Sequence, residues 1–184
     1  SSFYSPLIIL ILLKISNNEE TIGINFIKNK INELIIPIPC EENYIILNTE
    51  NSETKTNLDF KDNKFNINLD ISVKAVINEV NCKIDLQNNE SIKKIASDGE
   101  KIIKEYIEKA INLAKENQTD IFGFGRMIYK NYPKKWKKLK DNWDNEFNNL
   151  NINSKITVKI KGTGALKQSL EEFKWKSNYH KLVV

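Results

Sequence analysis

The stretch that decides the fold is KFNINLDISVKAVINE, Lys64–Glu79, in which apolar and polar residues alternate. One face carries seven apolar residues: Phe65, Ile67, Leu69, Ile71, Val73, Ala75 and Ile77. Alternation with a period of two over this length is typical of a long strand in an antiparallel sheet, with one face on the core and one in water. The Asp62-Asn63 pair before it is a turn signal, which predicts a hairpin with Thr54–Phe60.

After this strand the hydrophobic period changes to that of helices. From Ile92 to Ala114 apolar residues recur at helical spacing, opposite Glu and Lys, which predicts a long amphipathic helix. Asp98-Gly99 marks a point where it can divide into a short and a long helix. Asp120 can cap a second helix, and Pro133 suits the first turn of a third helix that runs to Phe147.

The remaining segments complete an α+β pattern. Ser16 and Glu19 have capping-box spacing, which predicts a short helix over 17–26. Short strands are expected over Leu34–Cys40 and Tyr44–Thr49, and a closing strand from Ile152 to Ile160. We predict an antiparallel β-sheet meander with a long amphipathic helix and two shorter helices packed on one face, and a returning C-terminal strand. A single domain over residues 1–184 is expected, with its core at about 16–164.

Composition excludes several classes of protein. The chain has 184 residues, 40% of them hydrophobic, with 28 Lys+Arg against 24 Asp+Glu and a net charge of +4. This hydrophobic content excludes a disordered chain. Leu7–Leu13 is an apolar run of seven residues, shorter than the roughly 20 residues that span a bilayer, and no cation precedes it. We expect a buried strand there, and a soluble chain with no anchor or signal of its own.

The densest positive cluster is Lys134, Lys135, Lys137, Lys138 and Lys140. It can bind an anionic surface or a nucleic acid, or it can be the solvated face of a helix. The second interpretation is favoured because Trp136 and Trp143 repeat at core spacing. The chain has one arginine, Arg126, whereas phosphate recognition favours arginine forks.

Two cysteines leave two alternatives open. Cys40 and Cys82 match no metal-binding pattern. A disulfide between them would close a loop of about 43 residues and add about 4 kcal/mol of stability. Two unpaired, buried thiols are the simpler prediction.

The sequence offers no convergent catalytic groups. The single histidine, His180, lies four residues from the end of the chain, and no serine sits in a nucleophile elbow. Gly123-Phe124-Gly125 lacks the spacing of a phosphate-binding loop. No catalytic residue, metal site or cofactor is predicted, and we expect that the protein is not an enzyme.

One block of sequence carries a family resemblance. TDIFGFG at Thr119–Gly125 is followed by YPKKW at Tyr132–Trp136, and then by Trp143 and Phe147. The block resembles the C-terminal domain of the Ger(x)C germination lipoproteins, the C subunits of nutrient germinant receptors in spore-forming bacteria. In that family a long helix ends at such a turn, and a basic, tryptophan-containing helix and an alternating strand follow. Asp98–Gly164 reproduces this order, and the resemblance covers roughly residues 16 to 164.

The resemblance implies particular roles for the signature residues. They are expected to be structural and to lie where a partner surface could form: Asp120, Phe122, Gly123, Gly125, Pro133, Trp136 and Trp143. Asp120 would cap a helix, and the two glycines would allow close approach. The two tryptophans would pack the basic helix onto the sheet.

The resemblance also implies a function. It indicates a non-catalytic receptor subunit that acts in nutrient-triggered germination through protein–protein contacts. Its partners would be the membrane-embedded A and B subunits, with the full-length protein lipid-anchored on the outer face of the inner spore membrane. The alternative is a module that binds an anionic surface or a nucleic acid through the Lys134–Lys140 helix. Of these, a nucleic-acid partner is not expected. A small-molecule binding module is a third hypothesis.

Overall fold

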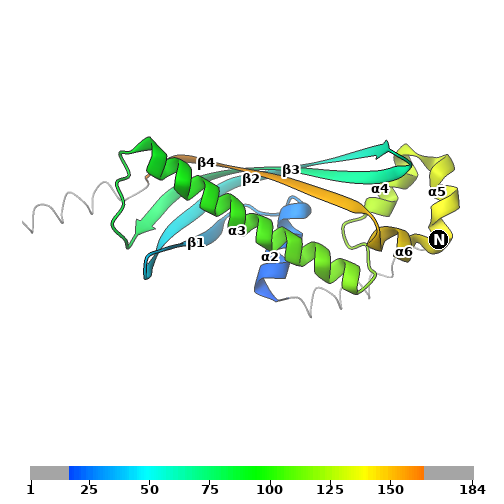
Figure 1. Cartoon of the computed structure of the whole chain (residues 1–184), viewed down its shortest axis with the longest axis horizontal. Coiled ribbons are helices and arrows are strands. Elements are labelled where there is room, and N and C mark those ends of the chain that lie inside the picture. The colour runs from blue at the N-terminus through cyan, green and yellow to red at the C-terminus, as the bar shows by residue number, and fades with distance from the viewer. Residues whose placement is uncertain (1–16, 164–184) are drawn as a thin grey trace, which may run out of the picture. The chain divides into compact units, whose positions relative to one another are not determined.

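The computed structural model describes residues 17–163. Four strands form one sheet in the order β1-β2-β3-β4, with helices between β3 and β4 and before β1 (Figure 1). The elements are α2 (Asn18–Ile27), β1 (Leu34–Cys40), β2 (Asn43–Lys61), β3 (Lys64–Val80), α3 (Asn89–Glu116), α4 (Phe124–Asn131), α5 (Pro133–Leu139), the 3-10 helix η1 (Lys140–Asn142), α6 (Trp143–Asn148) and β4 (Asn151–Thr163). The predicted strand at Leu7–Leu13, His180 and the tail from Ala165 lie outside the described residues.

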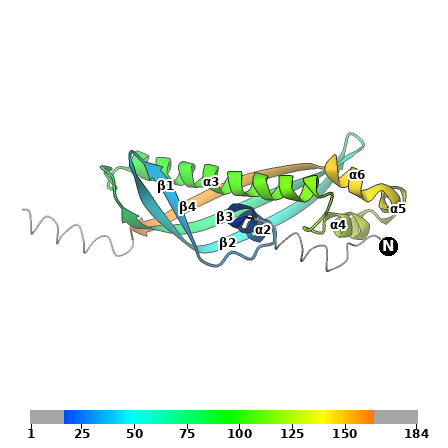
Figure 2. The same cartoon turned by 90° about the horizontal axis from the view of Figure 1, so that it is seen from below.

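The chain divides into two compact units, each of which takes part of β2, β3, β4 and α3. Among the described residues, unit 1 holds 17–31, 52–72 and 103–157, and unit 2 holds 32–51, 73–102 and 158–163. In each unit the strand segments form a layer that the α3 segment covers (Figure 2). The expected single domain over 1–184 stays a prediction.

The α+β class with a mostly antiparallel sheet is confirmed. β2 and β3 form the predicted hairpin, and both turn residues, Asp62 and Asn63, have positive φ angles of 51° and 60°. This left-handed backbone suits the twist of a two-residue hairpin. The seven apolar residues of β3 are all buried, as the alternation predicts.

The last strand returns in parallel with its neighbour. In unit 1 the Asn151 side chain donates to Asn66 (2.8 Å) and the Asn153 side chain donates to Asn68 (3.0 Å), so residue numbers rise together along β3 and β4. A helical crossover between two strands permits this direction, whereas a hairpin does not. β4 is therefore the parallel member of the sheet.

Two predicted breaks are absent. The strands predicted at 44–49 and 54–60 are one strand, β2, in which Glu50 and Asn51 are exposed in succession and shift the alternation by one residue. The possible break at Asp98-Gly99 was wrong, because α3 continues through it. In unit 2 a Cβ on Gly99 would lie 3.2 Å from Leu47, so the glycine allows the helix to approach the strands closely.

The prediction for the start of α2 needs correction. The capping box of α2 consists of Asn17 and Glu20, one residue later than Ser16 and Glu19. The Glu20 N–H donates to the Asn17 side chain (2.9 Å), and the Asn17 N–H donates to the Glu20 carboxylate (2.7 Å). Asparagine caps as well as serine does, so the same spacing fits one residue further on.

The helix predicted from Pro133 to Phe147 is broken into α5, η1 and α6. Asn142 leaves the helical conformation, with φ −127° and ψ 26°. In an unbroken helix, Trp136 and Trp143 would lie two turns apart, about 10 Å along the axis. The break brings their ring centroids to 5.2 Å.

The prediction of unpaired thiols was wrong. In unit 2 a disulfide joins Cys40, at the end of β1, to Cys82, just after β3, with the Cα atoms 6.1 Å apart. Between these strands, the Asn81 N–H donates to the Tyr44 carbonyl (3.1 Å), which aligns the end of β3 with the start of β2. The sheet order thus brings together two cysteines that are far apart in sequence.

Candidate functional site

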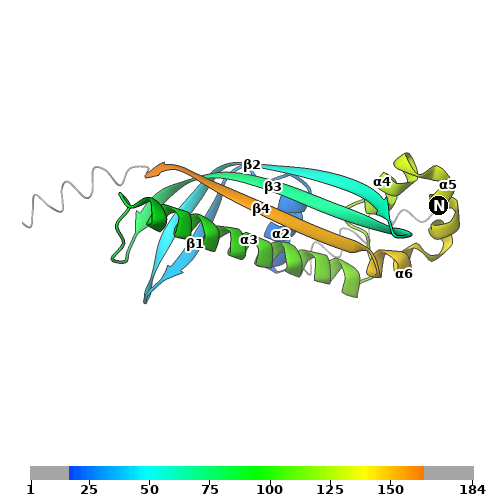
Figure 3. The same cartoon turned by 45° about the horizontal axis from the view of Figure 1, so that its top comes forward.

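The candidate site is the segment 119–150 of unit 1, which we call the turn–helix segment. It contains the turn after α3, the helices α4, α5 and α6, and the start of the link to β4. Figure 3 shows these three helices gathered near the β2–β3 turn. All seven signature residues lie in this segment.

Asp120 organises the turn. Its carboxylate accepts hydrogen bonds from the backbone N–H groups of Gly123 (2.8 Å), Phe124 (3.0 Å) and Gly125 (2.7 Å). Phe124 and Gly125 are the first two residues of α4, where N–H groups have no partner inside the helix. Asp120 therefore caps α4, although Gly123 occupies the N-cap position.

Burial dominates the electrostatics of this carboxylate. Asp120 is 8% exposed, and burial raises its pKa above 3.8, while the three backbone N–H donors and the Trp143 side chain oppose that rise. A buried carboxylate with this many donors fixes the backbone of the turn around it.

The two glycines of the turn have different roles. Gly123 has φ +79° and open space where a Cβ would be, so it supplies left-handed backbone. The expectation that Gly123 allows close approach was therefore wrong. A Cβ on Gly125 would lie 2.8 Å from the indole of Trp143 and 3.0 Å from that of Trp136, so this glycine does allow close approach.

The aromatic residues hold the helices of the segment to one another. Trp136 and Trp143 are buried, lie 5.2 Å apart and both meet α4 at Gly125, so their described contacts join α5 and α6 to α4. The Phe122 ring lies 5.3 Å from that of Phe124, and Pro133 occupies the first turn of α5.

A second aromatic cluster joins the segment to the β2–β3 hairpin. The Phe65 ring lies 4.7 Å from Phe60 and 5.3 Å from Tyr132, the residue just before α5. Lys135 of α5 places its ammonium 3.5 Å from the centroid of the Phe60 ring, in a cation–π contact. This cluster was not predicted from the sequence, because no local pattern links residues 60 and 65 to residue 132.

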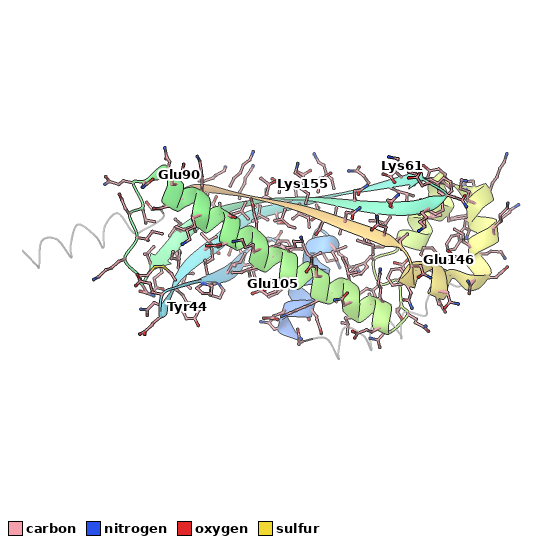
Figure 4. The ribbon with its side chains drawn as sticks, viewed as in Figure 1. Tyr44, Lys61, Glu90, Glu105, Glu146 and Lys155 are labelled. Atoms are coloured by element: carbon pink, nitrogen blue, oxygen red, sulfur yellow. A yellow bond between two sulfur atoms is a disulfide. The ribbon has the colours of Figure 1, made fainter. Side chains whose placement is uncertain are left out.

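A groove of about 760 Å³ lies between α5, α6 and the hairpin. Four lysines line it: Lys64, Lys134, Lys135 and Lys138. Glu146 of α6, labelled in Figure 4, is the one carboxylate in the lining. Lys137 and Lys140 do not line the groove, so the predicted lysine cluster divides into two groups.

The described residues do not form a metal site or a membrane span. Among residues 17–163 there is no group of three or more His, Cys, Asp or Glu side chains that could hold a metal ion. Within the same residues, no helix has both the length and the apolar character needed to cross a bilayer.

These features define a class of protein: an α+β domain with a mostly antiparallel sheet, whose helices assemble on a capped Asp-Ile-Phe-Gly-Phe-Gly turn. The family model described as "Spore germination B3/ GerAC like, C-terminal" matches residues 12–164. The chain therefore belongs to this spore germination family, as the resemblance implied.

Two known proteins are similar to the chain. Spore germination protein KC of Bacillus subtilis (strain 168) is 27% identical over 150 residues, which cover 80% of this chain and 37% of that protein. The crystal structure of the GerBC protein has a TM-score of 0.69 and 18% identity, over 79% of this chain and 46% of that one. The chain thus spans less than half the length of each, and the structural likeness concerns the fold.

Proposed function

We propose that this chain is a non-catalytic domain of a germinant-receptor C subunit, which acts in nutrient-triggered spore germination through protein–protein contacts. Its partners would be the membrane-embedded A and B subunits, and the full-length protein would be lipid-anchored on the outer face of the inner spore membrane. The observation that carries the proposal is the family match across residues 12–164, which includes the whole turn–helix segment.

The chemistry of the turn–helix segment supports a structural function for the signature residues. The Asp120 carboxylate is taken up by backbone N–H groups, and Gly125 is covered by the two indoles. Such groups shape the segment and leave its outer surface to meet a partner.

The disulfide in unit 2 supports the proposed location. Cys40 and Cys82 are paired, and disulfides persist in oxidising environments rather than in a reducing cytosol. A position outside the inner membrane would satisfy this requirement.

The test is co-purification from spores. An affinity tag on the full-length protein, produced from its own promoter, would be used to recover complexes from detergent-solubilised spore membranes. We expect the A and B subunits to be recovered with it, and an untagged strain serves as the control. Recovery of the full-length protein without either subunit would contradict the proposal.

A further inference from the structure

We propose that the groove between α5, α6 and the β2–β3 hairpin binds an acidic peptide segment of a partner protein, one that also carries a bulky apolar side chain. The inference deepens the proposed function and rests on it, because it names the chemistry of a contact that the function requires.

The positive charge of the groove is the first reason to expect an acidic occupant. Four lysines and one glutamate line the groove, so the net charge of its lining is +3 at neutral pH. Within residues 17–163, none of the ion pairs involves Lys64, Lys134 or Lys138. A concave surface with one sign of charge concentrates its field on the opposite charge, which here means an anionic occupant.

Apolar residues also line the groove, and they are the second reason to expect such a peptide. Phe65, Trp143 and Leu150 line the groove and are 8%, 3% and 6% exposed, whereas Lys64, Lys134 and Lys138 are exposed. We call the three apolar residues the floor of the groove and the three lysines its rim. A groove with apolar walls and a few charged groups suits a ligand that combines both characters. Its volume, about 760 Å³, falls in the range of roughly 300–1,000 Å³ found for ligand sites.

Two other anionic occupants fit less well. Phosphate recognition favours arginine forks, and the residues that line the groove include no arginine, so a nucleic acid fits less well. A flat bilayer surface attracts lysines by charge, but it would leave the apolar residues that also line the groove without a contact. An extended acidic peptide can place carboxylates at the rim and an apolar side chain on the floor.

The lysines of this region provide a matched pair of variants. Lys134 and Lys138 line the groove, whereas Lys137 and Lys140 lie in the same stretch and do not. All four are exposed, so replacement by glutamine removes the same charge without disturbing the core. The groove variant is Lys134→Gln with Lys138→Gln, and the matched variant is Lys137→Gln with Lys140→Gln.

The experiment measures fluorescence anisotropy of a fluorescein-labelled peptide of alternating glutamate and phenylalanine, with the full 184-residue chain. We expect the wild type to bind, the groove variant to bind about tenfold more weakly, and the matched variant to stay within about twofold. A peptide with serine in place of phenylalanine should also bind more weakly, because the floor would lose its contact.

Several results would overturn the inference. They are no binding by the wild type, equal weakening in the two variants, and no effect of replacing phenylalanine. Preferential binding of phosphatidylglycerol vesicles or of oligothymidylate, with the same dependence on Lys134 and Lys138, would assign the groove to lipid or to nucleic acid instead. If the peptide fails to bind while the full-length protein still recovers the A and B subunits, only the groove assignment falls.

Discussion

Unit 2 and the turn–helix segment of unit 1 are stabilised in different ways. Unit 2 combines alternating strands, an α3 segment packed closely at Gly99, and the disulfide between Cys40 and Cys82. The helices of the turn–helix segment are too short to be stable alone. They assemble around the buried Asp120 carboxylate and the indoles of Trp136 and Trp143.

This difference teaches where single substitutions will matter. In alternating strands many buried side chains share the stabilisation, so each one is a modest part of the whole. In the turn–helix segment one residue, Asp120, satisfies three backbone donors. The segment should therefore be sensitive at a few positions, which are the ones that the family signature marks.

The largest effect is expected from the disulfide. Replacing both Cys40 and Cys82 by alanine opens a link between residues 42 positions apart and should lower the free energy of unfolding by about 4 kcal/mol. Urea unfolding followed by circular dichroism would measure it, and reducing agent should have a similar effect on the wild type. A reducing agent that leaves the wild-type unfolding curve unchanged would contradict the pairing.

The next effect is expected at the cap. Asp120→Ala leaves the N–H groups of Gly123, Phe124 and Gly125 without their acceptor and should cost about 3 kcal/mol. The control is Asp141→Ala, whose side chain is 85% exposed and whose loss should cost less than about 0.5 kcal/mol. Equal unfolding curves for the two variants would show that the cap does not stabilise the segment.

A smaller effect is expected from Gly125→Ala. The new Cβ would lie within 3.0 Å of both indoles, which must then move apart, at a cost of about 2 kcal/mol. Trp fluorescence should change along with stability. Gly162→Ala is the control, since nothing lies within 4 Å of its Cβ position, and an equal cost for both substitutions would argue against close packing at Gly125.

The smallest effect concerns pH. Burial raises the Asp120 pKa above 3.8 in the folded state, so that state binds the proton more tightly than the unfolded chain does. The part of the stability that depends on protonation of Asp120 is therefore fully present below pH 3.8 and is lost as pH rises through the folded pKa. The hydrogen bonds from the three backbone N–H groups are a separate contribution, which Asp120→Ala removes. Relative to Asp120→Asn, which does not titrate, the wild type should lose unfolding free energy between pH 3.8 and neutrality. A difference that is constant with pH, or that grows in favour of the wild type, would contradict this direction.

Periodic patterns made most of the fold predictable. The alternation of β3, the Asp62-Asn63 turn and the helical spacing of α3 each report local geometry, and each was confirmed. The points where helices continue or end were predicted less well, because tertiary contacts determine them. Gly99 stays helical against the strands. α5 ends at Leu139, and the break before α6 lets Trp143 contact Trp136.

The site was predictable only where its residues lie close together in sequence. The Asp120 turn spans six residues, so the motif itself indicates the cap. The disulfide, the contact of Phe60 and Phe65 with Tyr132, and the groove all join residues that are distant in sequence. Such contacts depend on the order of strands in the sheet, which hydrophobic periodicity does not specify.

The most direct test of the account is whether the groove of the turn–helix segment is needed to hold a partner in spores. Full-length protein carrying Lys134→Gln with Lys138→Gln would be compared with protein carrying Lys137→Gln with Lys140→Gln, by the amounts of A and B subunits that co-purify. The account predicts a marked loss for the first variant and wild-type recovery for the second. Wild-type recovery for both, or equal loss for both, would contradict it.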